Sequence, residues 1–190
     1  MDTTTALTSV DRLAAAIRTR LGPESRWRLR VHPDRYAVEL IPQAPPPAAL
    51  VLAAITEDAR QDAVMTYARL RATELRARLR LVHVCTGRGR ETDGVRMRPE
   101  TLAQADLLLA AAVHDGLGPA EIAAAERQIL HDEDPGAALR VLAEHAALLV
   151  VGADADAVGA TSGALIGRTA CPLALVLAGA RPPDGAIDPA

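Results

Sequence analysis

The residues best suited to chemistry lie in one short turn near the carboxyl end of the sequence. An apolar run from Ala147 to Val151 ends at Gly152, and Gly159 opens a second segment after a loop of small residues. Thr161 and Ser162 follow that glycine and offer two hydroxyl groups. In open parallel sheets, ligands bind beyond the carboxyl ends of the strands, and the free amides at a helix start attract anions. The sequence therefore predicts a place for a nucleotide phosphate in this turn.

Two carboxylates lie inside the same turn, at Asp154 and Asp156. Because like charges repel at short range, they oppose a bound triphosphate unless a cation or an arginine lies between them. Clustered carboxylates also favour hard metal ions, so the pair is a candidate metal site for a hydrolase or a transferase. The simpler hypothesis, which we favour, is that both are solvated loop residues and that no metal binds.

The remaining reactive side chains do not assemble into a catalytic set. His83 lies in an apolar strand, where a histidine is more often a hydrogen-bonded core residue than a general base. Cys85 and Cys171 are expected on separate strands, so we expect neither a disulfide nor a metal pair.

One loop is rich in arginine, which suits phosphate, but it lacks aromatic residues for base stacking, so nucleic acid binding is not expected. Its arginines are Arg88, Arg90, Arg96 and Arg98. We therefore expect no enzymatic activity.

Alternating strands and helices position the turn. The continuous apolar run from Leu50 to Ile55 is typical of a strand that is buried on both faces. Pro99 suits the first turn of a helix, and Asp134 followed by Pro135 begins another. Strands are predicted over 50–55, 79–85, 121–130, 147–151 and 172–177, and helices over 58–78, 99–116, 134–145 and 159–170.

A different pattern precedes this alternation. Thr8 and Asp11 have the spacing of a capping box, and the helix that they begin stops at Gly22. Residues 26–31 alternate arginine with apolar side chains, and a second strand over 36–41 completes a hairpin whose arginines face solvent. The proline-rich segment 42–47 is a stiff linker. We expect a helix–hairpin module over 1–47, one α/β domain over 48–179 and a disordered tail over 180–190.

The composition of the chain excludes several classes of protein. The formal net charge of −3 gives no overall attraction to nucleic acid or to an anionic membrane. No run approaches the roughly 18 apolar residues of a membrane span, and the first residues lack the pattern of a secretion signal. All 21 basic residues are arginine, so no lysine is present for a phosphate-binding loop or a Schiff base. A reduced, cytoplasmic protein is the simplest interpretation.

Residues 49–178 resemble the universal stress protein family. Three local matches carry the resemblance, and they occur in the order that the family has them. They are the strand ending Leu81-Val82-His83-Val84, the helix from Asp134-Pro135 that leads into 146–152, and the ending from Ala170-Cys171-Pro172 to Val176. The resemblance implies a doubly wound α/β domain with a five-stranded, mainly parallel sheet in the order 3-2-1-4-5. The module over 1–47 lies outside it.

A subset of this family binds ATP through a Gly-x-x-Gly pair and a later Gly-Ser or Gly-Thr at a helix start. Gly152 matches the first glycine here, but Ala155 stands at the second, and Thr56 stands where an acidic residue usually ends the first strand. Gly159 matches the helix start, Ala160 replaces the hydroxyl residue, and the loop is about six residues short. The resemblance therefore implies a degenerate nucleotide site. If it still binds ATP or AMP, its residues are Ala54, Ile55, Thr56, Val84, Val151, Gly152, Gly159, Ala160, Thr161 and Ser162.

Many members of the family form dimers through the last strand. The corresponding segment here is apolar throughout and is expected at an exposed edge of the sheet. An unprotected edge of that kind pairs readily with a second chain, so we expect a homodimer. The predicted dimer edge consists of Pro172, Leu173, Ala174, Leu175, Val176 and Leu177.

Three functions follow from these features. The preferred hypothesis is a non-catalytic stress-response or regulatory protein without a cofactor, acting through dimerisation and an unidentified protein partner. The second is a sensor that still binds ATP or AMP at the degenerate turn. The third is a metal-dependent hydrolase or transferase that uses Asp154 and Asp156. The first is preferred because the turn has lost a glycine and a hydroxyl residue and has gained two carboxylates.

Overall fold

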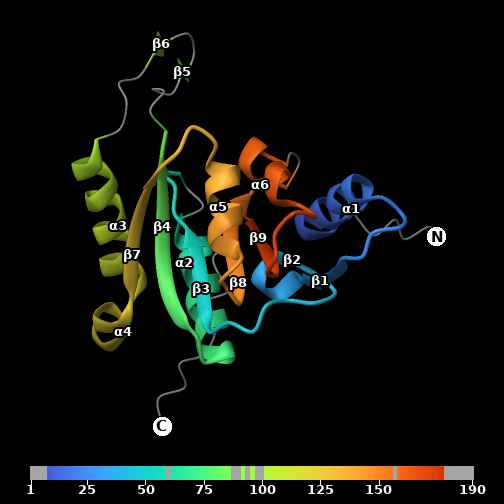
Figure 1. Cartoon of the computed structure of the whole chain (residues 1–190), viewed down its shortest axis with the longest axis horizontal. Coiled ribbons are helices and arrows are strands. Elements are labelled where there is room, and N and C mark those ends of the chain that lie inside the picture. Colours follow the sequence, from blue (N-terminus) through green and yellow to red (C-terminus); the bar gives the residue numbers. More distant parts are fainter. Residues whose placement is uncertain are drawn as a thin grey trace, which may run out of the picture.

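The computed structural model describes residues 8–58, 61–86, 91–92, 95–96, 101–155 and 158–177. Within these residues the chain forms a seven-stranded sheet in the order β1-β2-β9-β8-β3-β4-β7, with helices on both faces (Figure 1). The strands are β1 Arg28–His32, β2 Ala37–Ile41, β3 Leu50–Ala54, β4 Arg78–Cys85, β7 Glu126–His131, β8 Leu148–Ala153 and β9 Leu173–Leu177. The helices are α1 Ser9–Leu21, α2 Gln61–Leu75, α3 Leu102–Gly116, α4 Pro119–Ala124, α5 Pro135–Ala143 and α6 Ala160–Leu165. A short 3-10 turn, η1 Pro33–Arg35, joins β1 to β2, and β5 Glu91–Thr92 pairs with β6 Val95–Arg96.

The predicted α/β class is confirmed, but the number of strands is not. The five strands β7, β4, β3, β8 and β9 are parallel to one another and lie in the predicted relative order. The sheet then continues, because β2 pairs antiparallel with β9 and β1 pairs antiparallel with β2. The overall strand count and order therefore differ from the five-stranded expectation. The predicted helix and hairpin are both present, and the hairpin extends the same sheet.

The amino-terminal helix is fixed by its own sequence signals. The Thr8 hydroxyl accepts a hydrogen bond from the backbone of Asp11, whose carboxylate in turn accepts one from the Thr8 amide. The helix ends at Gly22, which has a φ of 77° that favours glycine. Its buried side chains pack on the sheet together with Val38, Leu40 and residues of β9, α5 and α6. The helix and the hairpin thus share one hydrophobic core with the α/β layers.

Two apolar layers enclose the sheet. Helices α1, α5 and α6 contribute to the layer on one face, while α2 and α3 contribute to the layer on the other. Strand β7 starts at Glu126, whereas the sequence predicted a strand from residue 121. Residues Pro119–Ala124 form the helix α4 instead, and the Glu121 carboxylate accepts a hydrogen bond from the Gly118 amide at its start. The helix predicted over 159–170 ends at Leu165.

Some expectations concern residues outside the described part of the chain. These include the disordered tail over 180–190 and the loop arginines Arg88, Arg90 and Arg98, whereas Arg96 is described only as a backbone position in β6. No described helix is both long enough and apolar enough to cross a membrane.

Candidate functional site

The predicted phosphate turn joins β8 to α6. Strand β8 runs through Gly152 to Ala153, so the first glycine of the degenerate motif belongs to the sheet rather than to the loop. Gly159 precedes the first residue of α6, and no side chain caps that helix. Because α6 has only six residues, few peptide dipoles are aligned behind its free amides. The turn therefore has the expected position, and its short helix attracts an anion less strongly than a longer helix does.

A hydrogen bond closes the turn from inside. The Ser162 hydroxyl donates to the Gly152 carbonyl oxygen at 3.1 Å, and the Ser162 residue is only 5% exposed. Its side chain therefore ties α6 back to the end of β8. A phosphate oxygen at this position would have to displace that carbonyl, which would leave a half-buried acceptor without a partner. Ser162 thus acts as a structural residue in this fold.

The loop itself also packs inward. Ala155 and Val158 are partly buried against the hydrophobic core, on the side that includes α5 and α6. Neither residue offers a polar group from its side chain, and both reduce the space that a ligand could use beyond β8. Asp156 lies outside the described residues. Within the residues that the structure describes, no three His, Cys, Asp or Glu side chains form a group that could hold a metal ion.

The ends of β3 and β4 contribute mostly side chains that are already engaged. The Thr56 hydroxyl donates to the Asp58 carboxylate at 2.9 Å, while Ile55 is buried among the residues packed under α2 and α3. His83 Nδ1 lies 2.8 Å from the Ile55 carbonyl oxygen, and the histidine is buried. The prediction that His83 is a hydrogen-bonded core residue is therefore confirmed.

The structure thus brings the ten candidate residues together beyond the carboxyl ends of β3, β4 and β8 and in the first turn of α6. Ala54 and Val84 are partly buried at the ends of β3 and β4, and Val151 is buried in β8. Gly159 and Ala160 are exposed at the start of α6, and Thr161 is half-buried there. That these residues bind a nucleotide stays a prediction.

The predicted exposed edge at β9 is wrong. Strand β2 pairs with β9 over four positions, placing Val38 opposite Leu175 and Leu40 opposite Leu173. All five residues of β9 are buried, and so is Cys171, whose burial raises the pKa of its thiol to about 12. The hairpin of the same chain therefore occupies the β9 edge, where the sequence predicted pairing with a second copy. The expected dimer through Pro172 to Leu177 therefore loses its physical basis.

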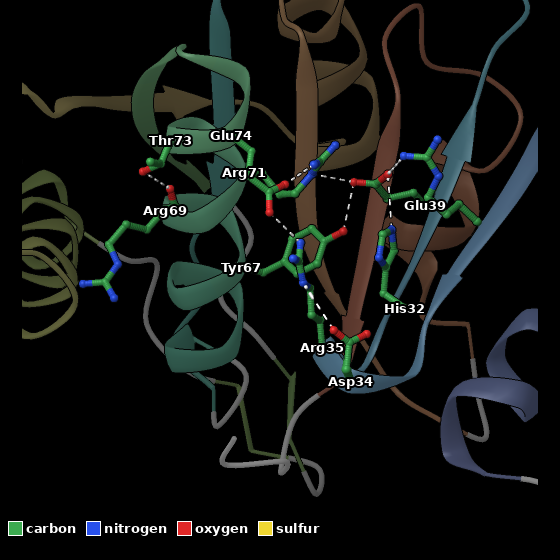
Figure 2. Close-up of polar contacts among 10 residues, drawn as sticks. His32, Asp34, Arg35, Glu39, Tyr67, Arg69, Arg71, Thr73 and Glu74 are labelled. Carbon is green, nitrogen blue, oxygen red and sulfur yellow. Dashed lines mark hydrogen bonds and ion pairs between the residues drawn. The ribbon is translucent and has the colours of Figure 1, made fainter. Parts of the chain in front are cut away.

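A buried charged cluster lies where the hairpin meets α2, and sequence reasoning missed it (Figure 2). The Glu39 side chain, on β2, is only 2% exposed. One of its carboxylate oxygens accepts a hydrogen bond from the Tyr67 hydroxyl at 2.9 Å and lies 2.9 Å from Arg71 Nε. The other oxygen lies 3.5 Å from His32 Nε2 and 3.9 Å from an Arg30 nitrogen. We call Glu39, Tyr67, Arg71 and His32 the Glu39 cluster.

Burial and neighbouring charges in the Glu39 cluster change the pKa of two of its members, Tyr67 and Arg71. Burial, together with the neighbouring Glu39 charge, raises the pKa of Tyr67 far above its ordinary value, so the phenol remains a hydrogen-bond donor. Burial by itself would lower the pKa of Arg71, but the charges of Glu39 and Glu74 outweigh it and raise that pKa. Arg71 Nε forms an ion pair with Glu39 without hydrogen-bond geometry, and His32 Nε2 lies near the same carboxylate without a hydrogen bond. Arg35 and Arg71 both pair with Glu74, which extends the network along α2.

The Glu39 cluster links the amino-terminal hairpin to helix α2 of the α/β layers. Its members come from β1, β2 and α2, which are separated in sequence by the linker and by β3. A charge buried in this way is costly unless it is paired, so the cluster depends on β2 staying beside β9 under α2.

Comparisons with known proteins match the fold of this chain. No family model and no curated protein sequence matches it. A universal stress protein from Archaeoglobus fulgidus matches with 19% identity and a TM-score of 0.51, over 70% of this chain and 100% of that one. A universal stress protein in complex with cAMP matches with 17% identity and a TM-score of 0.50, over 70% of this chain and 98% of that one. The predicted resemblance is confirmed in three dimensions: the chain has the α/β fold of the universal stress proteins.

Proposed function

We propose that this chain is a member of the universal stress protein family that acts without catalysis, as a stress-response or regulatory protein that binds another macromolecule. In this proposal its ancestral nucleotide turn is closed, and nucleotide is not its ligand. The amino-terminal hairpin occupies the β9 edge, so dimerisation through that edge is not part of the proposal.

The observation that carries the proposal is the hydrogen bond from Ser162 to the Gly152 carbonyl. It engages one of the two hydroxyl groups of the turn, that of Ser162, in a contact inside the fold. The inward packing of Ala155 and Val158 supports the same conclusion, because it fills part of the turn with apolar side chains. The turn is also short of the backbone amides that a phosphate chain requires.

Isothermal titration calorimetry with ATP, AMP and cAMP tests the proposal. We expect no saturable heat up to millimolar nucleotide, with or without Mg²⁺. A dissociation constant in the micromolar range for any of the three would contradict it.

The second candidate is a nucleotide sensor, and two observations favour it. One matched structure is a complex with cAMP, and Gly159 and Ala160 are exposed where a phosphate would contact α6. A variant separates the two candidates. A Cβ added at Gly159 would meet no atom within 4 Å, and its φ of −57° suits any residue, so Gly159→Ala should keep the fold. If nucleotide binds, the added methyl group beside the amides at the start of α6 should weaken that binding. If the proposed function holds, neither the parent chain nor Gly159→Ala should bind nucleotide.

A further inference from the structure

We infer that the free edge of β1 is a docking site for an extended, acidic segment of a partner protein, which pairs with β1 and continues the sheet. This inference rests on the proposed partner-binding function and specifies the class of partner. It concerns residues 26–32, which lie outside the predicted nucleotide turn. The calorimetry described above tests that turn separately.

Strand β1 leaves one edge of the sheet open among the described residues. Among the described residues β1 ends the sheet and pairs only with β2, and Figure 1 shows it at the end opposite β7. In an antiparallel ladder, every second residue of an edge strand directs its N–H and C=O groups away from the sheet. Such groups are a template for an added strand, and partner peptides use them in this way in β-strand addition. The β9 edge, in contrast, is already occupied.

The exposed side chains of this edge are positively charged. Arg28 and Arg30 are exposed on one face of β1, preceded by Arg26. Arg26 and Arg28 make no ion pair with the described residues. Arg30 is 55% exposed and lies 3.9 Å from Glu39, whose carboxylate already contacts Arg71 and Tyr67. Residues 8–41 hold seven arginines and four carboxylates although the whole chain has a net charge of −3. The edge therefore favours a strand that carries carboxylates.

The two faces of β1 differ in chemistry. Leu29 and Val31 lie on the opposite face of β1 from its arginines, and they are partly buried against the core beside α1. A neighbouring strand would place its own alternate side chains next to them. The partner that fits both faces therefore alternates acidic with apolar residues over about five positions.

Other occupants fit this edge less well. A second copy paired antiparallel through β1 would bring the arginines of the two copies together, and like charges across strands destabilise pairing. RNA would complement the positive charge of the edge. It has, however, no backbone N–H and C=O groups that could form a strand ladder with β1. At the opposite edge, β7, the charges are already satisfied: Arg127 lies 3.3 Å from Asp106, and Glu126 lies 2.5 Å from Arg80.

The experiment uses the full chain and a fluorescein-labelled peptide of ten residues in which glutamate alternates with valine. Fluorescence polarisation measures the affinity, and hydrogen exchange measures protection of the β1 amides. We expect saturable binding with slower exchange within 28–32. Arg28→Glu should weaken it about tenfold. The matched control, Arg127→Glu on β7, should leave it unchanged.

Two further peptides separate strand addition from simple charge attraction. The same peptide with lysine in place of glutamate should bind Arg28→Glu better than it binds the parent chain, because the charges are exchanged on both sides. The glutamate peptide with alternate backbone N-methylation keeps its charge but cannot pair, so it should not bind.

Several results would overturn the inference. One is absence of binding by the glutamate peptide to the folded parent chain. Equal binding of the N-methylated peptide, or protection at β7 instead of β1, would show that strand addition to β1 is not the mode of binding. Tighter binding of a uridine oligonucleotide than of the peptide, with the same loss in Arg28→Glu, would assign the edge to nucleic acid.

Discussion

The Glu39 cluster gives the most quantitative prediction, through the substitution Glu39→Gln. Glutamine keeps the shape of the side chain and removes its charge. Breaking a buried ion pair costs about 3–5 kcal/mol, because the remaining charge is left unpaired. Arg71 retains Glu74, and its side chain is 14% exposed, so the loss should be smaller, about 2–3 kcal/mol. For a chain of this size we expect the Tm to fall by about 4–12 °C.

Urea denaturation followed by circular dichroism measures this loss as a change in the free energy of unfolding. Glu74→Gln is the matched control, since it also removes one carboxylate that pairs with Arg71 but from a side chain that is 33% exposed. It should cost about 1 kcal/mol or less. Tyr67→Phe, which removes the hydrogen bond to Glu39, should fall between the two, at about 1.5–2 kcal/mol.

A free energy of unfolding of Glu39→Gln within about 0.5 kcal/mol of that of the parent chain, the usual range for surface substitutions, would contradict a buried and paired carboxylate. An equal loss of stability in Glu74→Gln and in Glu39→Gln would contradict it as well. Either result would mean that the carboxylate of Glu39 is solvated and that the hairpin is not fastened to α2 by a buried charge.

Three further predictions concern acid stability, packing and mass. A hydrogen bond from Arg80 holds the pKa of Glu126 below its ordinary value of 4.5, so this stabilisation is present above that value and is lost as the pH falls through the lower, folded-state pKa. Acid titration of the Tm should therefore show a shallower decline in Glu126→Gln than in the parent chain, and parallel curves would contradict this. A Cβ at Gly136 would lie 2.7 Å from the Ala164 Cβ, so Gly136→Ala should lower the Tm by separating α5 from α6, while Gly159→Ala should leave it unchanged. Because β2 covers β9, light scattering should give the 19.9 kDa of one chain, and a twofold mass that persists at low micromolar concentration would count against a covered edge.

Much of the fold could be predicted because local signals agree with it. Thr8 with Asp11, and Asp134 before Pro135, are capping arrangements that need only neighbouring residues, and both are present in the structure. The continuous apolar runs of β3 and β8 likewise indicate strands covered on both faces. These features depend on a few adjacent positions, which a single sequence displays directly.

The strand count could not be predicted because pairing depends on distant residues. The alternation in 36–41 identifies a strand, but it does not reveal that β9 is its neighbour. An apolar strand such as 173–177 looks the same whether a second copy or a hairpin of the same chain lies beside it. Only the fact that Val38 and Leu40 bury their side chains with Leu173 and Leu175 settles the pairing.

The candidate site shows the same division. The position of the turn between Gly152 and Gly159 follows from the order of the elements, and so does its place at the carboxyl ends of the strands. The hydrogen bond of Ser162 to Gly152 depends on the orientation of a side chain, which no spacing rule supplies. Glu39 was missed for a related reason: a carboxylate that alternates with valine and leucine suggests a solvent face, and only α2 makes that face buried.

The central claim of this account is that the turn between β8 and α6 is closed to nucleotides. The most direct measurement is a nuclear magnetic resonance titration of the full chain with cAMP and ATP, following the backbone amides of Gly152, Gly159 and Thr161. We predict that these amides keep their chemical shifts up to millimolar nucleotide. Saturable shifts at Gly159 and Thr161, together with loss of the Ser162 hydrogen bond to Gly152, would contradict the claim and would identify the turn as a working nucleotide site.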